Sequence, residues 1–228
     1  MKKILILFML LMAITSSCFA ASINEEFENT NIEQVKHGIV KAINMFSTKT
    51  NLIEKDNNTI VLFNVVDTVD KDNKFMYRDK KDIICELVQK GNNVELKLSN
   101  RYERIYADGT NEFEEYDNVK ELQAVLNSIK RLFFDSYIYG ISSSREIKDN
   151  GVIINVVENS PAAKAGIKTG DCLISINGKS IVDNFEDFNM GLMIDMFSSE
   201  PATFVVVQDG EEKTIEVTPD KIDAIGLK

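Results

Sequence analysis

Few residues in this sequence of 228 residues have the types and spacing that enzyme catalysis requires. His37 is the only histidine, so it is the only side chain whose ordinary pKa would suit a general base for a serine or cysteine nucleophile. No glycine–serine–glycine nucleophile elbow accompanies it. We therefore predict no catalytic residues, and we expect His37 to be a solvent-exposed histidine.

Two groups of acidic residues match known sites only in part. Asp67-Thr68-Val69 is similar to the Asp-Thr/Ser-Gly turn of retroviral-type aspartic proteases, but Val69 replaces the glycine that lets two carboxylates approach each other. Asp67, Asp70 and Asp72 suggest a calcium loop at first glance, but the glycine and the distal bidentate glutamate are not at the places that such a loop requires. We predict a polar turn here, and neither an aspartic protease site nor a calcium site.

The cysteine and histidine content argues against a metal site. The sequence has three cysteines and one histidine, and no pair of them has zinc-ligand spacing. We expect no metal and no other cofactor. Cys85 and Cys172 could form a disulfide in an oxidising compartment, but we favour the alternative that they are two small buried residues in separate domains.

The first 20 residues have the pattern of a secretory signal peptide. Met1-Lys2-Lys3 is basic, the run Ile4–Ile14 carries no charge, and small and polar residues lead to Ala20-Ala21. Because the apolar run is too short to span a bilayer, we predict cleavage after Ala20, no integral membrane span, and export to the periplasm or the extracellular space. The alternative is a lipoprotein anchored through Cys18, although the apolar residue that a lipobox wants three positions earlier is missing.

The chain is acidic. Its formal net charge is −10 at pH 7, and removal of the two signal-peptide lysines lowers it by two, to −12. An acidic chain without a basic stripe is repelled by phosphate backbones, which excludes nucleic acid as a partner. Hydrophobic residues make up 44% of the sequence, which is enough for a packed core and argues against disorder.

The first half of the chain after the signal peptide has the hydrophobic periodicity of a helix, then of strands, then of a second helix. Residues 21–31 are polar and acidic and are predicted to be a flexible lead-in. Apolar residues at helical spacing predict one helix from about Thr30 to Phe46 and another from Val119 to Phe133. Four acidic residues are predicted to form the solvated start of the second helix, where they complement its dipole: Glu112, Glu114, Glu115 and Asp117. Period-two alternation predicts a meander of four or five antiparallel strands at Leu52–Ile53, Thr59–Val66, Ile83–Val88, Val94–Leu98 and Tyr102–Tyr106.

The second half contains the signals of a small β domain with two helices. Ser160 and Pro161 suit the N-cap and first position of a short helix, and Gly166 suits the left-handed residue behind it. A second helix is predicted after Asp183 from the helical spacing of Phe185, Phe188, Leu192 and Met196. Strands are predicted at Val152–Val157, Leu173–Ile176, Phe204–Gln208 and Lys213–Val217, with two-residue turns at Asn177-Gly178 and Asp209-Gly210.

The ordered run from Asn159 to Gly178, NSPAAKAGIKTGDCLISING, resembles the PDZ domain. It is most similar to the bacterial PDZ domains of C-terminal processing proteases and of the high-temperature-requirement family, and the resemblance covers about Tyr137–Pro219. The predicted fold is α+β, with an N-terminal helix–antiparallel meander–helix module followed by a PDZ-like, partly open β-barrel with two helices. The predicted parts are a signal peptide (1–20), an N-terminal α+β domain (21–134), a PDZ-like domain (135–220) and a C-terminal tail (221–228).

The resemblance implies a peptide-binding groove. A PDZ domain adds an extended peptide to a sheet edge beside a helix, and backbone amides in a turn hold the terminal carboxylate. Ile138-Tyr139-Gly140-Ile141 stands where the family has its apolar–Gly–apolar loop, so the amides of Tyr139, Gly140 and Ile141 would receive the carboxylate. The implied peptide-pairing strand is Ser142–Glu146, with Ser142, Ser143 and Ser144, and the residues implied to face the peptide from the helix are Phe185, Asn189 and Leu192 or Met193. The alternative is that the apolar residues among them are ordinary core packing.

These observations together predict an exported, non-catalytic adaptor, recognition or assembly factor of the cell envelope. It would bind a polypeptide C-terminus or an exposed strand, with an envelope protease or its substrate as the partner. The serine–lysine catalytic domain of C-terminal processing proteases follows the PDZ domain, and because the sequence ends at Lys228 we expect none. The alternative function is binding of a lipid or other apolar ligand by the N-terminal module, with the PDZ-like domain as a scaffold. That alternative requires an apolar cavity lined by Phe63, Phe75, Leu98 and Phe133.

Overall fold

The computed structural model describes residues 21–46, 50–114, 118–148 and 150–227. The signal peptide with Cys18 lies outside the described residues, as do Glu115 and Asp117. Contacts between Cα atoms divide the described chain into two compact units, one of residues 21–26, 50–88, 95–114 and 118–119 and one of residues 27–46, 89–94, 120–148 and 150–227. The domain boundaries predicted from the sequence stay predictions, because these units do not show which segments fold on their own.

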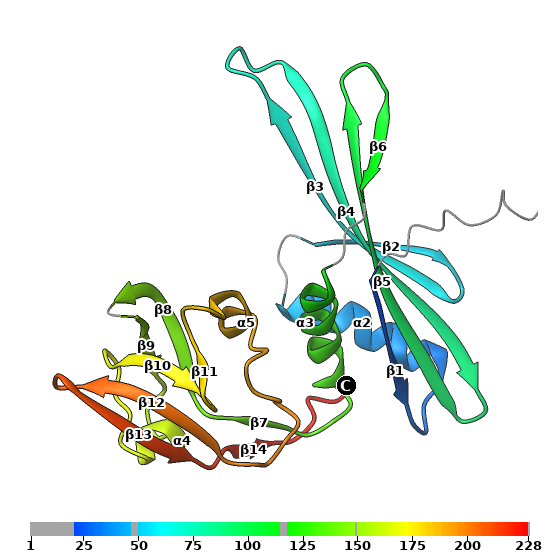
Figure 1. Ribbon diagram of the computed structural model, residues 1–228. Helices are drawn as coiled ribbons and strands as arrows, with labels where there is room; N and C mark the ends of the chain where they lie inside the picture. Colours follow the sequence, from blue (N-terminus) through cyan, green and yellow to red (C-terminus); the bar gives the residue numbers. More distant parts are fainter. Residues whose placement is uncertain (1–20, 47–49, 115–117, 149, 228) are drawn as a thin grey trace, which may run out of the picture. The chain divides into compact units, whose positions relative to one another are not determined.

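Within the described residues, six strands of the first half form a sheet in the order β1-β5-β4-β3-β2, with β6 paired to β5 (Figure 1). The strands are β1 (Ser22–Phe27), β2 (Asn51–Asp56), β3 (Thr59–Val69), β4 (Phe75–Lys90), β5 (Asn93–Tyr106) and β6 (Asn111–Glu114). Strands β3 and β4 form one long antiparallel hairpin, paired from Thr59 opposite Glu86 to Val69 opposite Phe75. At its turn, the Asp70 carboxylate accepts hydrogen bonds from two backbone amides, as the prediction of a polar turn requires.

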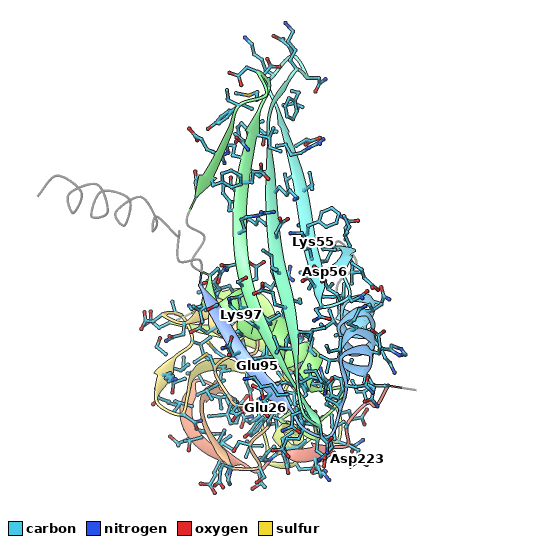
Figure 2. All side chains as sticks on the ribbon, turned by 90° about the vertical axis from the view of Figure 1, so that its right-hand side faces the viewer. Glu26, Lys55, Asp56, Glu95, Lys97 and Asp223 are labelled. Atoms are coloured by element: carbon cyan, nitrogen blue, oxygen red, sulfur yellow. The ribbon has the colours of Figure 1, made fainter. Side chains whose placement is uncertain are left out.

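Alternation along β5 separates a buried face from a solvated face. Val94, Leu96 and Leu98 are fully buried, whereas Lys97 is exposed and its Nζ lies 3.3 Å from Glu86 Oε2. Figure 2 labels Lys97 and Glu95 on this strand. The prediction of a half-solvated antiparallel strand is therefore confirmed for this segment.

Two predictions for this half are wrong. Residues 22–27 are a strand rather than part of a flexible lead-in, because their exposure alternates and ends at the buried Phe27, a periodicity that the acidic composition conceals. Glu112 and Glu114 lie on β6, opposite Arg104 and Tyr102 of β5, and do not start a helix. The helix–meander–helix arrangement is not confirmed, since β1 precedes the first helix and β6 follows the meander.

The two long helices form where helical spacing predicts them. Helix α2 (Ile32–Phe46) is capped by Asn31, whose side chain accepts from the amide of Gln34, and its buried residues include Val35 and Ile39. Helix α3 (Val119–Lys130) buries Leu122, Leu126 and Ile129. His37 is exposed on α2, as the sequence predicts.

The PDZ-like region contains a second sheet in the order β13-β12-β10-β9-β8, with β11 paired to β10, and a separate pair β14-β7 (Figure 1). Its strands are β7 (Ser136–Ile138), β8 (Ile141–Lys148), β9 (Gly151–Val156), β10 (Cys172–Ile176), β11 (Lys179–Ser180), β12 (Ala202–Gln208), β13 (Glu211–Val217) and β14 (Asp220–Ile222). Its helices are α4 (Pro161–Lys164) and α5 (Phe185–Asn189). A buried apolar cluster that includes Ile154, Leu173 and Phe204 forms the core of this region.

Local signals set the start of α4 and the tight turns. The Ser160 side chain accepts from the amide of Ala163 at 3.3 Å, and Pro161 occupies the first helical position. Asn177 and Gly178 have φ values of 49° and 75°, the left-handed pair of a two-residue hairpin turn. These predictions are confirmed.

The second helix of this region is shorter than predicted. Helix α5 ends at Asn189, its N-cap is Asn184 rather than Asp183, and Gly191 adopts φ +70° just behind it. Leu192 and Met196 therefore lie outside the helix that their spacing predicts. A glycine with left-handed backbone ends the helix because residues with a Cβ rarely adopt that conformation.

Residues 220–226 are held by strand pairing, an ion pair and backbone hydrogen bonds. Strand β14 pairs with β7, and Lys221 Nζ lies 2.6 Å from Asp135 Oδ2. The amides of Ile225 and Gly226 donate to the carbonyls of Arg131 and Leu132 behind α3. Residues 221–227 are thus part of the second unit.

Candidate functional site

An apolar pocket of about 370 Å³ opens between the start of β8 and α5, with loop residues at one end. Its floor contains Ile176 and Phe204 of the core, and Phe188 of α5 forms one side. The lining residues are Tyr137, Ile138, Tyr139, Gly140, Ile141, Ser142, Val157, Ile176, Phe188, Gly191, Met193, Ile194, Met196 and Phe204.

Strand β8 is the edge of its sheet beside this pocket. Within the described residues it pairs with β9 on one side only, so the N–H and C=O groups that point the other way are available to another chain. Ile141, Ser142 and Ser143 pair in regular register with Val156, Asn155 and Ile154. This regular part begins directly at the pocket.

The edge of β8 is interrupted after three residues. Ser143 pairs with Ile154 and Ile147 pairs with Val152, so the three residues 144–146 lie opposite Ile153 alone. Within this bulge Arg145 has φ +66°, and its amide donates to Ser143 Oγ at 2.8 Å. The bulge breaks the alternation of N–H and C=O groups that a paired peptide needs.

The loop between β7 and β8 is built around Gly140. This residue has φ +78°, and a Cβ there would overlap the side chain of Ser160. The carbonyls of Tyr139 and Gly140 accept from the amides of Ala162 and Val157, whereas no turn or loop hydrogen bond of the described residues uses the amide of either. These two amides remain available at the pocket that both residues line.

Tyr139 has its side chain in the core. Its hydroxyl donates to the Glu200 carbonyl at 2.8 Å, and its ring lies 5.5 Å from that of Phe204. Burial, with smaller contributions from Asp195 and Glu200, raises the pKa of this phenol. The side chain thus fixes the loop, while the backbone of the same residue lines the pocket.

The sequence-predicted site residues divide into two groups. Tyr139, Gly140, Ile141 and Ser142 line the pocket together, as does Met193, the alternative to Leu192. The others do not line it: Ser143 follows on β8, Ser144 lies in the bulge, Phe185 and Asn189 lie on α5, and Leu192 lies behind it.

Sequence reasoning missed Phe188, Ile194 and Met196 as parts of the pocket wall, although it offered Met193 as the alternative to Leu192. A continuous helix to Met196 would turn Phe185, Asn189 and Leu192 toward a peptide. Because the chain leaves the helix at Asn189, the following turn brings Ile194 and Met196 to the pocket together with Met193. Gly191 in the middle of the predicted helix was the available signal.

The acidic and sulfur-containing candidates are held in structural roles. The Arg78 guanidinium donates to both Asp67 oxygens at 2.6 and 2.9 Å and lowers the pKa of that carboxyl, so Asp67 lies in a strand pair rather than the predicted turn. Cys85 and Cys172 are buried free thiols, which overturns the disulfide alternative. Burial raises the pKa of Cys85 to about 12.

Among the residues that the structure describes, no three His, Cys, Asp or Glu side chains lie close enough to hold a metal ion. No helix of these residues has the length and apolar character that a membrane crossing requires. The four residues proposed for an apolar cavity, Phe63, Phe75, Leu98 and Phe133, do not line the pocket beside β8.

Comparisons with known proteins match part of the chain. Residues 152–190 match the family model of the PDZ domain. A probable protease, eep, of Enterococcus faecalis is 41% identical over 66 residues, which are 29% of this chain and 15% of that protein. A putative zinc metalloprotease of Mesorhizobium japonicum is 38% identical over 80 residues (34% and 21%), and a DegP-like probable periplasmic serine endoprotease of Marinomonas sp. is 40% identical over 73 residues (31% and 15%).

Similarity to solved structures is distant. The HtrA-type protease AlgW with decapeptide has a TM-score of 0.38 at 13% identity, over 72% of this chain and 55% of that chain. The chain spans about a fifth or less of the length of the three curated relatives.

Proposed function

This chain carries a PDZ domain homologous to the PDZ domains of bacterial proteases, and we propose that the domain binds the C-terminus of a polypeptide in the pocket beside β8. The observation that supports this most directly is the coincidence of three features at one place. The unpaired edge of β8 begins at the apolar pocket, and the amides of Tyr139 and Gly140 lie at the same end.

Each feature suits one part of a peptide end. The strand edge offers main-chain hydrogen bonds, the amides offer donors to a carboxylate, and the apolar pocket takes the terminal side chain. Ile176, Phe188 and Phe204 are large and apolar, so the preferred terminal residue is a large aliphatic or aromatic one. An internal strand would lack the carboxylate that the two amides suit.

The length of the regular edge limits what is recognised. Only Ile141–Ser143 precedes the bulge, so the domain holds about the last three or four residues of its ligand. Such a short contact must order the peptide on docking, and we expect a dissociation constant on the order of micromolar.

The same proposal includes action without catalysis, as an exported adaptor or recognition factor for an envelope protease or its substrate. Export is supported by the secretory pattern of residues 1–20. Action without catalysis is supported by the solvent exposure of the sole histidine, His37, and by the ion pair that Asp67 forms with Arg78. One of the matched relatives is itself named a periplasmic endoprotease.

The test is a fluorescence-anisotropy titration of the full chain with a library of C-terminal peptides. Each peptide is paired with the same sequence ending in an amide, which replaces the charged terminal carboxylate with a neutral carboxamide. We expect saturable binding of peptides with apolar ends, weakened about tenfold or more by the amide, because charge-assisted hydrogen bonds are lost. Equal binding of both forms contradicts recognition of the terminus, and no binding at millimolar concentration contradicts peptide recognition altogether.

A further inference from the structure

Helix α5, the wall of the pocket, is only partly buried: Phe185 and Phe188 pack against the core without being fully enclosed by it. The helix contains five residues, none of which is buried, although Phe188 lines the pocket. Its N-cap residue, Asn184, makes no side-chain cap hydrogen bond. A helix this short is not stable by itself, so contacts from outside must decide where it stands.

One such contact comes from Lys120 in the first turn of α3. Its Nζ lies 2.6 Å from Asp187 Oδ1 and 3.6 Å from Glu186 Oε2, so a single cation is shared by two acids of α5. The Asp187 side chain is about three-quarters buried, at 25% exposure, which shields the pair partly from solvent.

Lys120 lies outside the PDZ-matched segment, whereas the two acids that it contacts lie inside it. Lys120 directly follows Val119, the last residue of the first compact unit, and it lies outside the segment 152–190 that matches the PDZ family model. Helix α3 has three buried residues and is better anchored than α5. The ion pair therefore ties a weakly held wall of the pocket to a well-held helix outside the matched segment.

We propose that Lys120 is a positioning residue, which holds α5 against the pocket through Asp187 and Glu186 and so makes peptide affinity depend on the first turn of α3. The effect on affinity rests on the proposed function, whereas the effect on α5 does not. Any displacement of the start of α3 would shift Asp187 and therefore also the position of Phe188, the next residue.

The test compares Lys120→Ala with Lys164→Ala in the full chain. Lys164 is a matched control, because its Nζ lies 3.2 Å from Asp220 in another exposed ion pair and it does not line the pocket. Hydrogen exchange is measured at the amides of Met190, Gly191 and Leu192, which donate to carbonyls of α5. Peptide affinity is measured in parallel.

For Lys120→Ala we expect exchange at these amides to quicken and peptide affinity to fall by about two- to fivefold, while Lys164→Ala matches the wild type. Salt near 1 M should remove most of the difference, because it screens the pair. Exchanging the charges, Lys120→Glu with Asp187→Lys, should restore slow exchange that either single change loses. If wild type binds no peptide, the proposed function fails and exchange alone decides the role of Lys120. Exchange in Lys120→Ala equal to that of the control overturns the proposal.

Discussion

Gly140 lies directly against Ser160, so that any Cβ at position 140 would overlap the Cβ and Oγ of the serine. Ser160 is also the N-cap of α4, and the Ala162 amide of that helix donates to the Tyr139 carbonyl. The pocket loop and the short helix are thus packed as one piece. This contact explains why the loop needs glycine for space as well as for its backbone conformation.

The first prediction separates the need for space at position 140 from the need for a left-handed backbone conformation. Gly140→Ala should lower the free energy of unfolding by about 2–4 kcal/mol, since it combines a left-handed backbone with a steric overlap. Gly178→Ala is the control, because Gly178 also has positive φ, at 75°, but has open space around it. It should cost about 1 kcal/mol. Urea unfolding of both variants measures the difference, and equal losses would contradict the packing argument.

The second prediction concerns the two phenylalanines of α5. Phe188 lines the pocket and Phe185 does not, although both pack against the core of this region. Phe188→Ala should therefore weaken peptide binding roughly tenfold, and Phe185→Ala should change it about twofold or less. The same anisotropy titration gives both values. A larger effect at Phe185 would favour the helix face that the sequence predicts.

The third prediction is a pH dependence of stability in the first unit. Tyr102 is buried and donates to Asp79 Oδ1 at 2.6 Å, and burial followed by this hydrogen bond raises its pKa from 10 to about 12. The folded chain thus holds the phenol proton more tightly than the unfolded chain. The resulting stability is fully present below pH 10 and is lost as the pH rises from 10 toward 12.

The measurement is the urea midpoint at several pH values from about 9 to 11, for wild type and Tyr102→Phe. The wild type should lose stability more steeply, because Tyr102→Phe keeps the ring but has no proton to release. Parallel curves for the two proteins would show that Tyr102 ionises alike in the folded and unfolded states.

The fourth prediction concerns the thiols. In a chain that begins at Ala21, Cys85 and Cys172 are the remaining cysteines, and both are buried and free. The pKa of about 12 for Cys85 keeps it protonated at neutral pH, and Cys172 Sγ donates to the Lys148 carbonyl at 3.1 Å. Neither should react with a thiol reagent until the chain is unfolded in denaturant. Rapid labelling of the native chain, or a mass that rises by two on reduction, would contradict this arrangement.

Sequence signals were most reliable where structure is decided locally. Ser160, Pro161 and the pair Asn177-Gly178 act through their own backbone and side-chain chemistry, and each appears where predicted. Strand β1 could not be predicted in this way, because its polar sequence hides a strand stabilised by pairing with β5, far along the chain. Pairing between distant segments leaves little trace in local composition.

The lining of the pocket was only partly predicted from the sequence, because only part of it is decided locally. The loop around Gly140 follows from the chemistry of one glycine between apolar residues. The opposite wall depends on where α5 ends, and Gly191 outweighs the apolar periodicity that continues to Met196. A periodic pattern predicts which residues share a helix face only as far as the helix itself extends.

The bulge at residues 144–146 has a consequence for how the protein behaves at high concentration. An unpaired sheet edge attracts other edges, and edge-to-edge growth is a common route to aggregation. In β8 the regular edge is three residues long, and it then twists away with charged Arg145 and Glu146 in the bulge. That length matches the short ligand proposed above but is too short to nucleate stacking between copies. We therefore expect the interruption to favour colloidal solubility, and its removal to make the protein more prone to form insoluble assemblies.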